Sequence, residues 1–328
     1  MEILRNIILS DNKNFRKRDK RTNKYFSLVE KEHKLFEKKF RNKSKIVSSA
    51  LFINKKNCSV CNSNNYKNFI IKFGFQYVKC SNCSHIYLRN QIKKKILLDL
   101  YSKSKTDRVS RERKKFSDLD IYWQNLYFKY SNIINTLKPK GKFLDIGCGD
   151  GAFLKFMKNN FNYELFGTEF SSDTKMKLKK LLGKNFFYQK EIEDLKIPNS
   201  YFDIISLIGV LEHLSDPGKM FKSLNKYLKK DGIIFILIPN IESYAFSILK
   251  DKTPALNPRA HLNFFNPKSL EKIAKKNNFK IINQYQELPV IDLVHEKRKV
   301  NDLILKKIIK ENKCYYHLYL LRKRTNKI

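Results

Sequence analysis

The residues most able to do chemistry in this sequence surround a cluster of glycines. An apolar run at residues 143–146, interrupted by Asp145, is followed by Gly147, Gly149 and Gly151 on alternate positions. A helical pattern begins directly afterwards, so the segment predicts a strand, a tight turn and a helix. Glycines adopt dihedrals that other residues avoid, and they let a ligand lie against bare backbone at the helix N-terminus. The segment therefore predicts a site for a nucleotide-type ligand.

The glycine loop alone leaves two classes of enzyme open. Gly147, Gly149 and Ala152 also satisfy the dinucleotide pattern G-x-G-x-x-G/A. Glu169, at the end of the next apolar run, could hold a ribose in either class. Asp145 favours a ligand with a cationic head, because an acid has no packing purpose in a buried parallel strand. An NAD-dependent enzyme is therefore the less favoured alternative.

Further motifs follow the glycine loop in order along the chain. Glu169 is followed by residues 202–205 and 210–217, which read Phe-Asp-Ile-Ile and Val-Leu-Glu-His-Leu-Ser-Asp-Pro. Together with residues 144–151, these motifs resemble the class I S-adenosylmethionine-dependent methyltransferases over roughly residues 140–325. The resemblance implies S-adenosylmethionine as cofactor, held by residues at the ends of successive strands: Asp145, Gly147, Cys148, Gly149, Gly151, Glu169, Phe170, Glu191, Ile192, Ile208 and Gly209.

Four of the six cysteines lie in one short window. Cys58 and Cys61 form one C-x-x-C pair, and Cys80 and Cys83 form another, with eighteen residues between the pairs. This spacing is typical of a tetrahedral zinc site built from two knuckles. A disulfide pair is the less favoured alternative, and His85 is an alternative ligand. With four thiolates no position stays open for water, so we predict a structural zinc ion.

The four-cysteine segment precedes the methyltransferase-like segment, and this order adds to the resemblance. A zinc ribbon ahead of a class I methyltransferase domain resembles a group of bacterial methyltransferases often associated with sugar and surface-polysaccharide pathways. Residues 80–88 resemble the second knuckle and following strand of that group. The resemblance implies a small-molecule acceptor, with nucleotide-linked and lipid-linked sugars among the candidates.

Methyl transfer needs few catalytic groups. A nucleophile must be held in line with the sulfonium methyl, and a base is needed when the nucleophile is a hydroxyl. The candidates are His213, His261 and Tyr244, each after a predicted strand, and each with a purely structural role as the alternative. His261 resembles the histidine of a Tyr-x-Glu-His stretch in sugar C-methyltransferases, but Pro258 and Ala260 replace the tyrosine and glutamate. This departure favours O- or N-methylation over C-methylation.

Alternating strand and helix patterns with short loops predict the architecture that positions these residues. They indicate a doubly wound α/β fold with a mostly parallel sheet and two late strands at residues 280–286 and 314–321. By the resemblance, the sheet is Rossmann-like and these two strands form its antiparallel edge. The resemblance implies seven strands. We predict four parts: a basic arm and helix at 1–50, a zinc ribbon at 51–90, a helical connector or lid at 91–140 and an S-adenosylmethionine-binding domain at 141–328.

The chain is strongly basic, with 68 Lys and Arg against 31 Asp and Glu and a net charge of +37. Such charge permits an RNA-modifying methyltransferase. Because the lysines are spread along the whole chain, a general bias in amino-acid composition is the favoured explanation of the charge. A basic surface would still favour an anionic substrate or membrane proximity. A non-catalytic binding protein with a degenerate fold is the third alternative. No apolar run reaches membrane-spanning length, so we expect a soluble, cytoplasmic protein. The sequence does not fix its oligomeric state.

Overall fold

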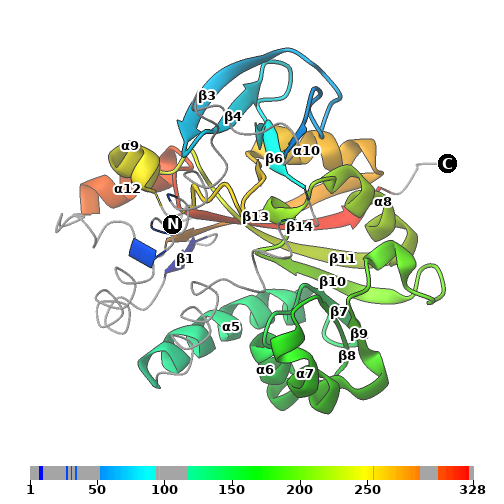
Figure 1. Cartoon of the computed structure of the whole chain (residues 1–328). Coiled ribbons are helices and arrows are strands. Elements are labelled where there is room, and N and C mark those ends of the chain that lie inside the picture. Colours follow the sequence, from blue (N-terminus) through cyan, green and yellow to red (C-terminus); the bar gives the residue numbers. More distant parts are fainter. Residues whose placement is uncertain are drawn as a thin grey trace.

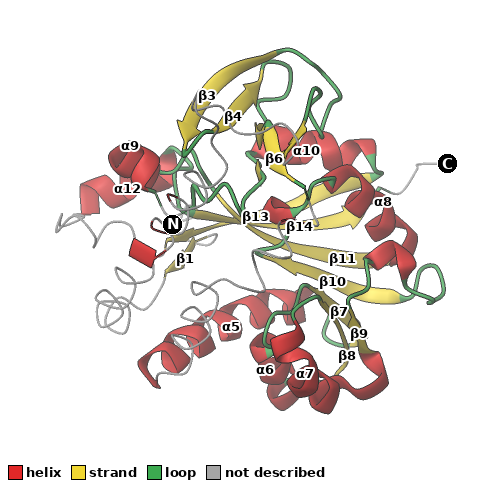
Figure 2. Ribbon diagram, viewed as in Figure 1, coloured by secondary structure: helices red, strands yellow, loops and turns green. Residues whose placement is uncertain are grey.

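The computed structural model shows a central sheet with helices on both faces and a smaller sheet beside its edge (Figure 1). Figure 2 shows the same layers by element type, with the smaller sheet above the central one in this view. The structure describes residues 7–9, 27, 28, 31, 34, 52–93, 96, 117–253, 255–288 and 302–324.

The central sheet has eight strands in the order β1-β13-β14-β11-β10-β7-β8-β9. Neighbours from β9 to β11 are parallel, whereas β14 is antiparallel to both β11 and β13. The doubly wound, mostly parallel prediction is therefore confirmed. The strands are β1 (Ile7–Leu9), β7 (Gly141–Ile146), β8 (Tyr163–Glu169), β9 (Phe186–Tyr188), β10 (Phe202–Ile208), β11 (Leu228–Pro239), β13 (Phe279–Leu288) and β14 (Tyr316–Lys323).

The eighth strand corrects the expected count of seven. β1 pairs in parallel with β13, with Ile7 opposite Gln286. A three-residue strand is too short to show a period, and it pairs with an edge strand that would otherwise expose unpaired backbone groups. The rest of the predicted arm lies outside the described residues. So does the predicted helix at 25–40, except for residues 27, 28, 31 and 34, which are helical.

Helices cover the two faces of the sheet because its central strands are apolar on both sides. In β10, Ile204 packs toward α5, α6 and α7, whereas Ile205 packs toward α8 and α10. This alternation follows the two-residue period of a strand. The helices are α5 (Ser117–Leu137), α6 (Ala152–Asn160), α7 (Lys175–Leu182), α8 (Pro217–Tyr227), α9 (Tyr244–Leu249), α10 (Pro267–Lys276) and α12 (Asp302–Lys310).

The smaller sheet contains the predicted ribbon but draws on a distant segment. Its strand order is β12-β5-β4-β3, with β3 (Tyr66–Lys72), β4 (Phe75–Cys80), β5 (Ile86–Leu88) and β12 (Asn263–Phe264). β12 pairs antiparallel with β5, so residues 263–264 complete a sheet that begins 200 positions earlier in the chain. A separate pair joins β2 (Phe52–Asn54) to β6 (Asn90–Ile92).

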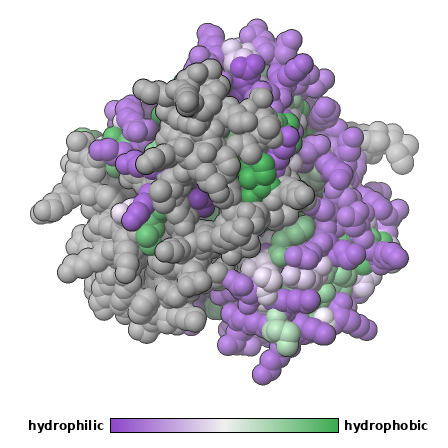
Figure 3. All heavy atoms as spheres, in the orientation of Figure 1, coloured by the Kyte–Doolittle hydropathy of each residue, from purple (hydrophilic) through white to green (hydrophobic). Residues whose placement is uncertain are grey.

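The ribbon shares its core with the central domain. Cys58, Val60, Val78 and Tyr87 belong to the same buried cluster as residues of β10, α8 and α10. The described surface on the face in Figure 3 is mainly hydrophilic, in keeping with 68 Lys and Arg in the chain. Among the described residues, no helix has both the length and the apolar character needed to cross a membrane.

Candidate active site and metal centre

The glycine loop connects β7 to α6 through left-handed backbone. Gly147 has φ +65°, and a Cβ there would lie 2.8 Å from Cγ2 of Val210. Gly149 has φ +59°, and a Cβ there would meet no atom of the described residues within 4 Å. Gly151 caps the N-terminus of α6, also in the left-handed region. The loop is therefore tightly packed below Gly147 and open beside Gly149, as a backbone cradle for a ligand requires.

Glu169 is held at the end of β8, facing the glycine loop. Its Oε2 accepts from the Gly149 amide at 2.7 Å, and its Oε1 accepts from the amides of Phe170 and Ser171 at 2.7 and 2.9 Å. These three amides fix the orientation of the carboxylate and use about three of its four lone-pair positions, so one position, on Oε2, stays available for a donor on a ligand. The Phe170 side chain is 38% exposed beside it.

Asp145 lies below the loop, 3% exposed. Its Oδ1 accepts from Ser206 Oγ at 2.6 Å. Burial raises the pKa of Asp145 to about 7, the hydrogen bond from Ser206 opposes this shift, and the charge of Glu169 adds to it. A cationic ligand group nearby would restore the charged form of the carboxyl. The neighbouring Cys148 is buried and packs toward Gly167, where a Cβ would lie 3.0 Å from Cys148 Sγ.

The structure places the other predicted cofactor residues along the same edge of the sheet. Ile208 ends β10 and Gly209 follows it with φ +67°. Glu191 precedes a short 3₁₀ turn in which Ile192 is 2% exposed and belongs to the hydrophobic core. Carboxyl ends of parallel strands form the ligand edge of open α/β sheets. Gly209 follows β10 at that edge and Glu191 follows β9, whereas the Ile192 side chain is in the core.

Two histidines and a glutamate meet beyond the end of β10. The rings of His213 and His261 have centroids 4.9 Å apart and cross at 78°. One potential ligand atom from each of Glu212, His213 and His261 lies within 4.8 Å of the others. A Cβ on Gly209 would lie 3.6 Å from Glu212 Oε1, which places the cluster directly over the end of β10.

The protonation of this cluster is set by its surroundings. The His261 Nδ1 lies 2.6 Å from the Ala255 carbonyl oxygen and must donate to it, so Nε2 of the neutral ring carries the lone pair. Desolvation lowers the pKa of His261, and the neighbouring His213 lowers it further. Desolvation also lowers the pKa of His213, whose side chain stays 39% exposed. Both rings are therefore neutral proton acceptors near neutral pH.

Glu212 belongs to this cluster of three residues, but it was not among the site residues predicted from the sequence. It is 3% exposed, and burial raises its pKa to about 8. The signal was a carboxylate between an apolar run and His213 in Leu211-Glu212-His213. Tyr244, by contrast, begins α9 and packs with Ile248 against α12. Its catalytic role remains a prediction.

The ribbon fixes the backbone that carries His261. The Tyr77 hydroxyl donates to the His261 carbonyl at 2.7 Å. The Leu88 amide donates to the Leu262 carbonyl at 2.9 Å, and the Leu262 amide donates to the Glu212 carbonyl at 2.7 Å. The segment after β11 is thus tied to the ribbon on one side and to the loop after β10 on the other.

The four ribbon cysteines converge. Cys58 Sγ lies 3.5 Å from Cys83 Sγ, and Cys61 Sγ lies 3.5 Å from Cys80 Sγ. All four sulfur atoms lie within 4.8 Å of one another. A tetrahedral zinc ion with Zn–S bonds of about 2.3 Å would separate its sulfurs by about 3.8 Å, so the set fits zinc closely. His85 is not part of this group, because its Nε2 lies 3.0 Å from Asn263 Oδ1.

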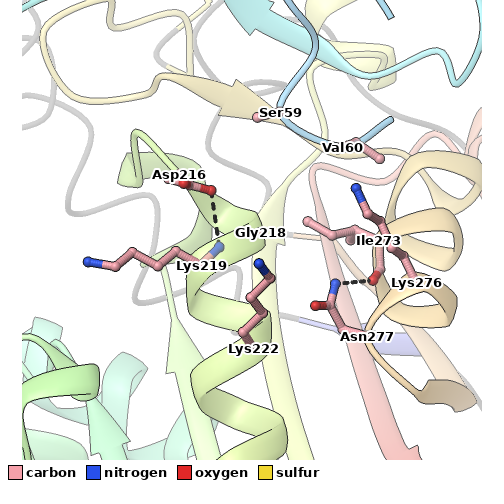
Figure 4. A pocket seen from close by; sticks show the side chains of 9 residues that line it. All are labelled: Ser59, Val60, Asp216, Gly218, Lys219, Lys222, Ile273, Lys276 and Asn277. Atoms are coloured by element: carbon pink, nitrogen blue, oxygen red, sulfur yellow. Dashed lines mark hydrogen bonds between the residues drawn. The ribbon is translucent and has the colours of Figure 1, made fainter. Parts of the chain in front are cut away.

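A separate cavity of about 240 Å³ opens between the first knuckle, α8 and α10 (Figure 4). Its walls carry Lys219, Lys222 and Lys276, with Ser59 on the ribbon side. None of the predicted cofactor residues lines it. It lies near the His261 segment, because the Ser59 hydroxyl donates to Asn263 Oδ1 at 3.4 Å.

Known proteins share the central part of this chain. Residues 122–284 match the model of a family described as a methyltransferase domain. A ubiquinone biosynthesis O-methyltransferase of Vibrio vulnificus is 29% identical over 194 residues, which cover 52% of this chain and 83% of that protein. A tRNA U34 carboxymethyltransferase of Campylobacter curvus is 31% identical, over 36% of this chain and 41% of that protein.

Other relatives are covered less fully. A phosphoethanolamine N-methyltransferase of Triticum aestivum is 30% identical, but the match spans only 21% of its length. Among solved structures, the 1,6-didemethyltoxoflavin-N1-methyltransferase of Burkholderia thailandensis is similar with a TM-score of 0.47 and 12% identity, over 79% of this chain and all of that chain.

The domain match and the glycine-loop fold together establish the class. The protein is a methyltransferase enzyme with the architecture of the class I S-adenosylmethionine-dependent group. The dinucleotide alternative is thereby set aside. The names of these relatives specify different substrates, so similarity alone does not assign a methyl acceptor to this chain.

Proposed function

We propose that this protein transfers the methyl group of S-adenosylmethionine to an oxygen or nitrogen atom of a small-molecule acceptor, a sugar or surface-polysaccharide intermediate. One observation carries the proposal: a preorganised nucleotide cradle and a pair of neutral histidines share the carboxyl edge of one sheet. The first part binds the methyl donor, and the second accepts a proton from the acceptor.

The cofactor is assigned to the edge from β7 to β10. Glu169 accepts a hydrogen bond from a ribose hydroxyl at the position left on Oε2, and the bare backbone of Gly149 lies against the methionyl group. Asp145 is held by Ser206 below this group and balances its positive charge. Phe170, Glu191 and Ile192 take the adenine side. Gly209 leaves room for the sulfonium methyl beside the histidine cluster.

The histidines serve the acceptor. A hydroxyl or amine held in line attacks the methyl carbon, the C–S bond breaks as the new bond forms, and the sulfur leaves as a neutral thioether. The acceptor proton passes to a ring nitrogen, with Nε2 of His261 available because Nδ1 donates to the Ala255 carbonyl. Pro258 and Ala260 provide no further acid or base, which supports O- or N-methylation over C-methylation.

Two further parts of the proposal concern zinc and the charge of the acceptor. A structural zinc ion at Cys58, Cys61, Cys80 and Cys83 would hold the ribbon whose strands carry the His261 segment. An anionic acceptor, such as a nucleotide-linked or lipid-linked sugar, is supported by the net charge of +37 and by the lysine-lined cavity next to that segment.

The test is methyl transfer from labelled S-adenosylmethionine to a panel of acceptors. The panel contains free sugars, nucleoside diphosphate sugars, lipid-linked sugar phosphates and RNA. We expect label in a nucleotide-linked or lipid-linked sugar, and loss of transfer in His261→Ala with S-adenosylhomocysteine binding retained. Transfer to RNA alone would replace this proposal with the RNA-modifying alternative, which the match to a tRNA-modifying enzyme also raises.

A further inference from the structure

The buried carboxylate of Glu212 lacks a partner that it needs. Its side chain is 4% exposed, and no donor among the described residues forms a hydrogen bond with Oε2. Its Oε1 lies 3.9 Å from His213 Nε2, beyond hydrogen-bonding distance. Leaving a buried carboxylate oxygen unsatisfied is costly, so a proton or a cation must complete this group.

The two neighbouring rings are oriented as metal ligands usually are. His261 donates from Nδ1 to the Ala255 carbonyl, so the lone pair of the neutral ring lies on Nε2. A backbone hydrogen bond between His213 and Ala260 opposes the effect of desolvation on the pKa of His213. Metal-binding histidines commonly donate their second ring nitrogen to a carbonyl, because this fixes the tautomer and the ring orientation.

We propose that Glu212, His213 and His261 bind one divalent transition-metal ion that also receives the hydroxyl of the acceptor. The proposal rests on the proposed function and narrows it, because a cation at this position selects an oxygen nucleophile. Two imidazoles and one carboxylate favour Zn²⁺, Mn²⁺, Fe²⁺ or Co²⁺ over Ca²⁺ and Mg²⁺. Three protein ligands leave positions open for the acceptor.

The site needs only a small adjustment to close around an ion. Metal–ligand bonds of about 2.0 to 2.2 Å place neighbouring ligand atoms about 3 to 3.6 Å apart. The atoms now lie within 4.8 Å of one another, so closure by about one ångström completes the site. His213 has the freedom to move, since 39% of its side chain is exposed.

The ion would act on the acceptor hydroxyl. A bound cation lowers the pKa of the hydroxyl, whose proton leaves to water, and the resulting alkoxide attacks the sulfonium methyl. The C–S electrons stay on sulfur, and the product is a methyl ether with neutral S-adenosylhomocysteine. The histidines are then ligands, and water takes the proton that the proposed function otherwise passes to His261. Gly209 places the ion next to the methyl donor, because its own Cβ would lie 3.6 Å from Glu212 Oε1.

Titration with Mn²⁺, followed by electron paramagnetic resonance, tests the site on the full-length, zinc-loaded protein. Mn²⁺ prefers oxygen and nitrogen ligands, so it reports on this cluster and not on the four cysteines. We expect one bound Mn²⁺ in the natural protein and at least tenfold weaker binding in Glu212→Gln. The matched control Glu164→Gln, on the exposed end of β8, should bind like the natural protein.

The outcomes separate the two proposals. Equal Mn²⁺ binding by Glu212→Gln, or no bound Mn²⁺ in the natural protein, would overturn the cation site and leave Glu212 as a protonated acid. Should Glu212→Gln not fold, His213→Gln replaces it, because that side chain reaches the surface. Binding of S-adenosylhomocysteine is measured on the same samples. Loss of Mn²⁺ binding with cofactor binding intact supports the site, whereas a natural protein that binds Mn²⁺ but no cofactor refutes the proposed function alone.

Discussion

The hydroxyl of Tyr77 connects the ribbon to the histidine cluster, and removing it tests whether the ribbon serves catalysis. Tyr77 is fully buried, its ring packs on Phe264 at 5.5 Å between centroids, and its hydroxyl donates to the His261 carbonyl at 2.7 Å. Tyr77→Phe keeps the ring and leaves that carbonyl without its donor. An unsatisfied buried acceptor costs about 1 to 3 kcal/mol, so the free energy of unfolding should fall by about that amount.

The catalytic effect should exceed the effect on binding. A displacement of about 1 Å at a catalytic group can cost about 100-fold in rate, so we expect kcat to fall by about 10- to 100-fold. The Kd for S-adenosylhomocysteine should not change, because Glu169 and the glycine loop are held by bonds of their own. Denaturant unfolding, steady-state kinetics and calorimetry measure the three quantities.

The ribbon offers a matched control in Tyr87. Its hydroxyl is buried and forms no hydrogen bond with any residue that the structure describes, so Tyr87→Phe removes the same atom without breaking a bond seen there. This variant should keep kcat and be as stable as the natural protein or slightly more stable. Equal kcat values for Tyr77→Phe and Tyr87→Phe would refute the inference that the ribbon positions His261.

Three further changes test other parts of the structure. Cys80→Ser should lower the thermal midpoint and release zinc, because it removes one of four converging thiolates; metal analysis and calorimetry measure both. The pKa of Asp145 is raised from 3.8 to about 7 in the fold, so the folded state holds this proton more tightly than the unfolded state. The free energy of unfolding should therefore fall as the pH rises between these two values, by on the order of 1 kcal/mol per pH unit. Asp145→Asn should flatten that loss in denaturant titrations from pH 5 to 7. Gly147→Ala should reduce the free energy of unfolding more than Gly183→Ala, because only the first Cβ, at 2.8 Å, meets Val210, and urea unfolding compares them.

Each of these has a clear contrary result. Full zinc content in Cys80→Ser would show that the thiolates do not act as one site. Parallel pH profiles for Asp145→Asn and the natural protein would show that this carboxyl is charged in the fold at pH 5. An equal loss of unfolding free energy in the two glycine variants would show that the left-handed backbone, which both positions share, causes the whole effect and that the contact with Val210 adds nothing.

The parts of the fold that the sequence predicted are those with local signals. Residues 143–156 combine an apolar strand, alternate glycines and a helical pattern within one short segment, and the structure has all three elements there. The two strands predicted near the C-terminus are also present, as β13 and β14, although their antiparallel pairing was implied by the family resemblance and not by a local pattern. Such elements are set mainly by side-chain periodicity and turn residues, which a sequence displays directly.

The features that escaped prediction depend on contacts between distant segments. β12 has two residues and is defined by pairing with β5, about 175 positions away in the chain, so no periodic pattern marks it. Glu212 looked like an ordinary polar residue, because its significance arises from burial among His213, His261 and Gly209. No sequence pattern singles out Tyr77, because its link to the site is the hydrogen bond from its hydroxyl to the His261 carbonyl.

The most direct test of the central claim is calorimetric titration with S-adenosylhomocysteine of the natural protein and of Glu169→Gln, with NADH as a separate ligand. Loss of charge-assisted hydrogen bonds worth about 1.5 to 3 kcal/mol predicts binding about 10- to 100-fold weaker in Glu169→Gln. Binding of S-adenosylhomocysteine, weakened in this way, together with no response to NADH, is the predicted result. Equal affinity in both proteins, or binding of NADH alone, would contradict the assigned cofactor site.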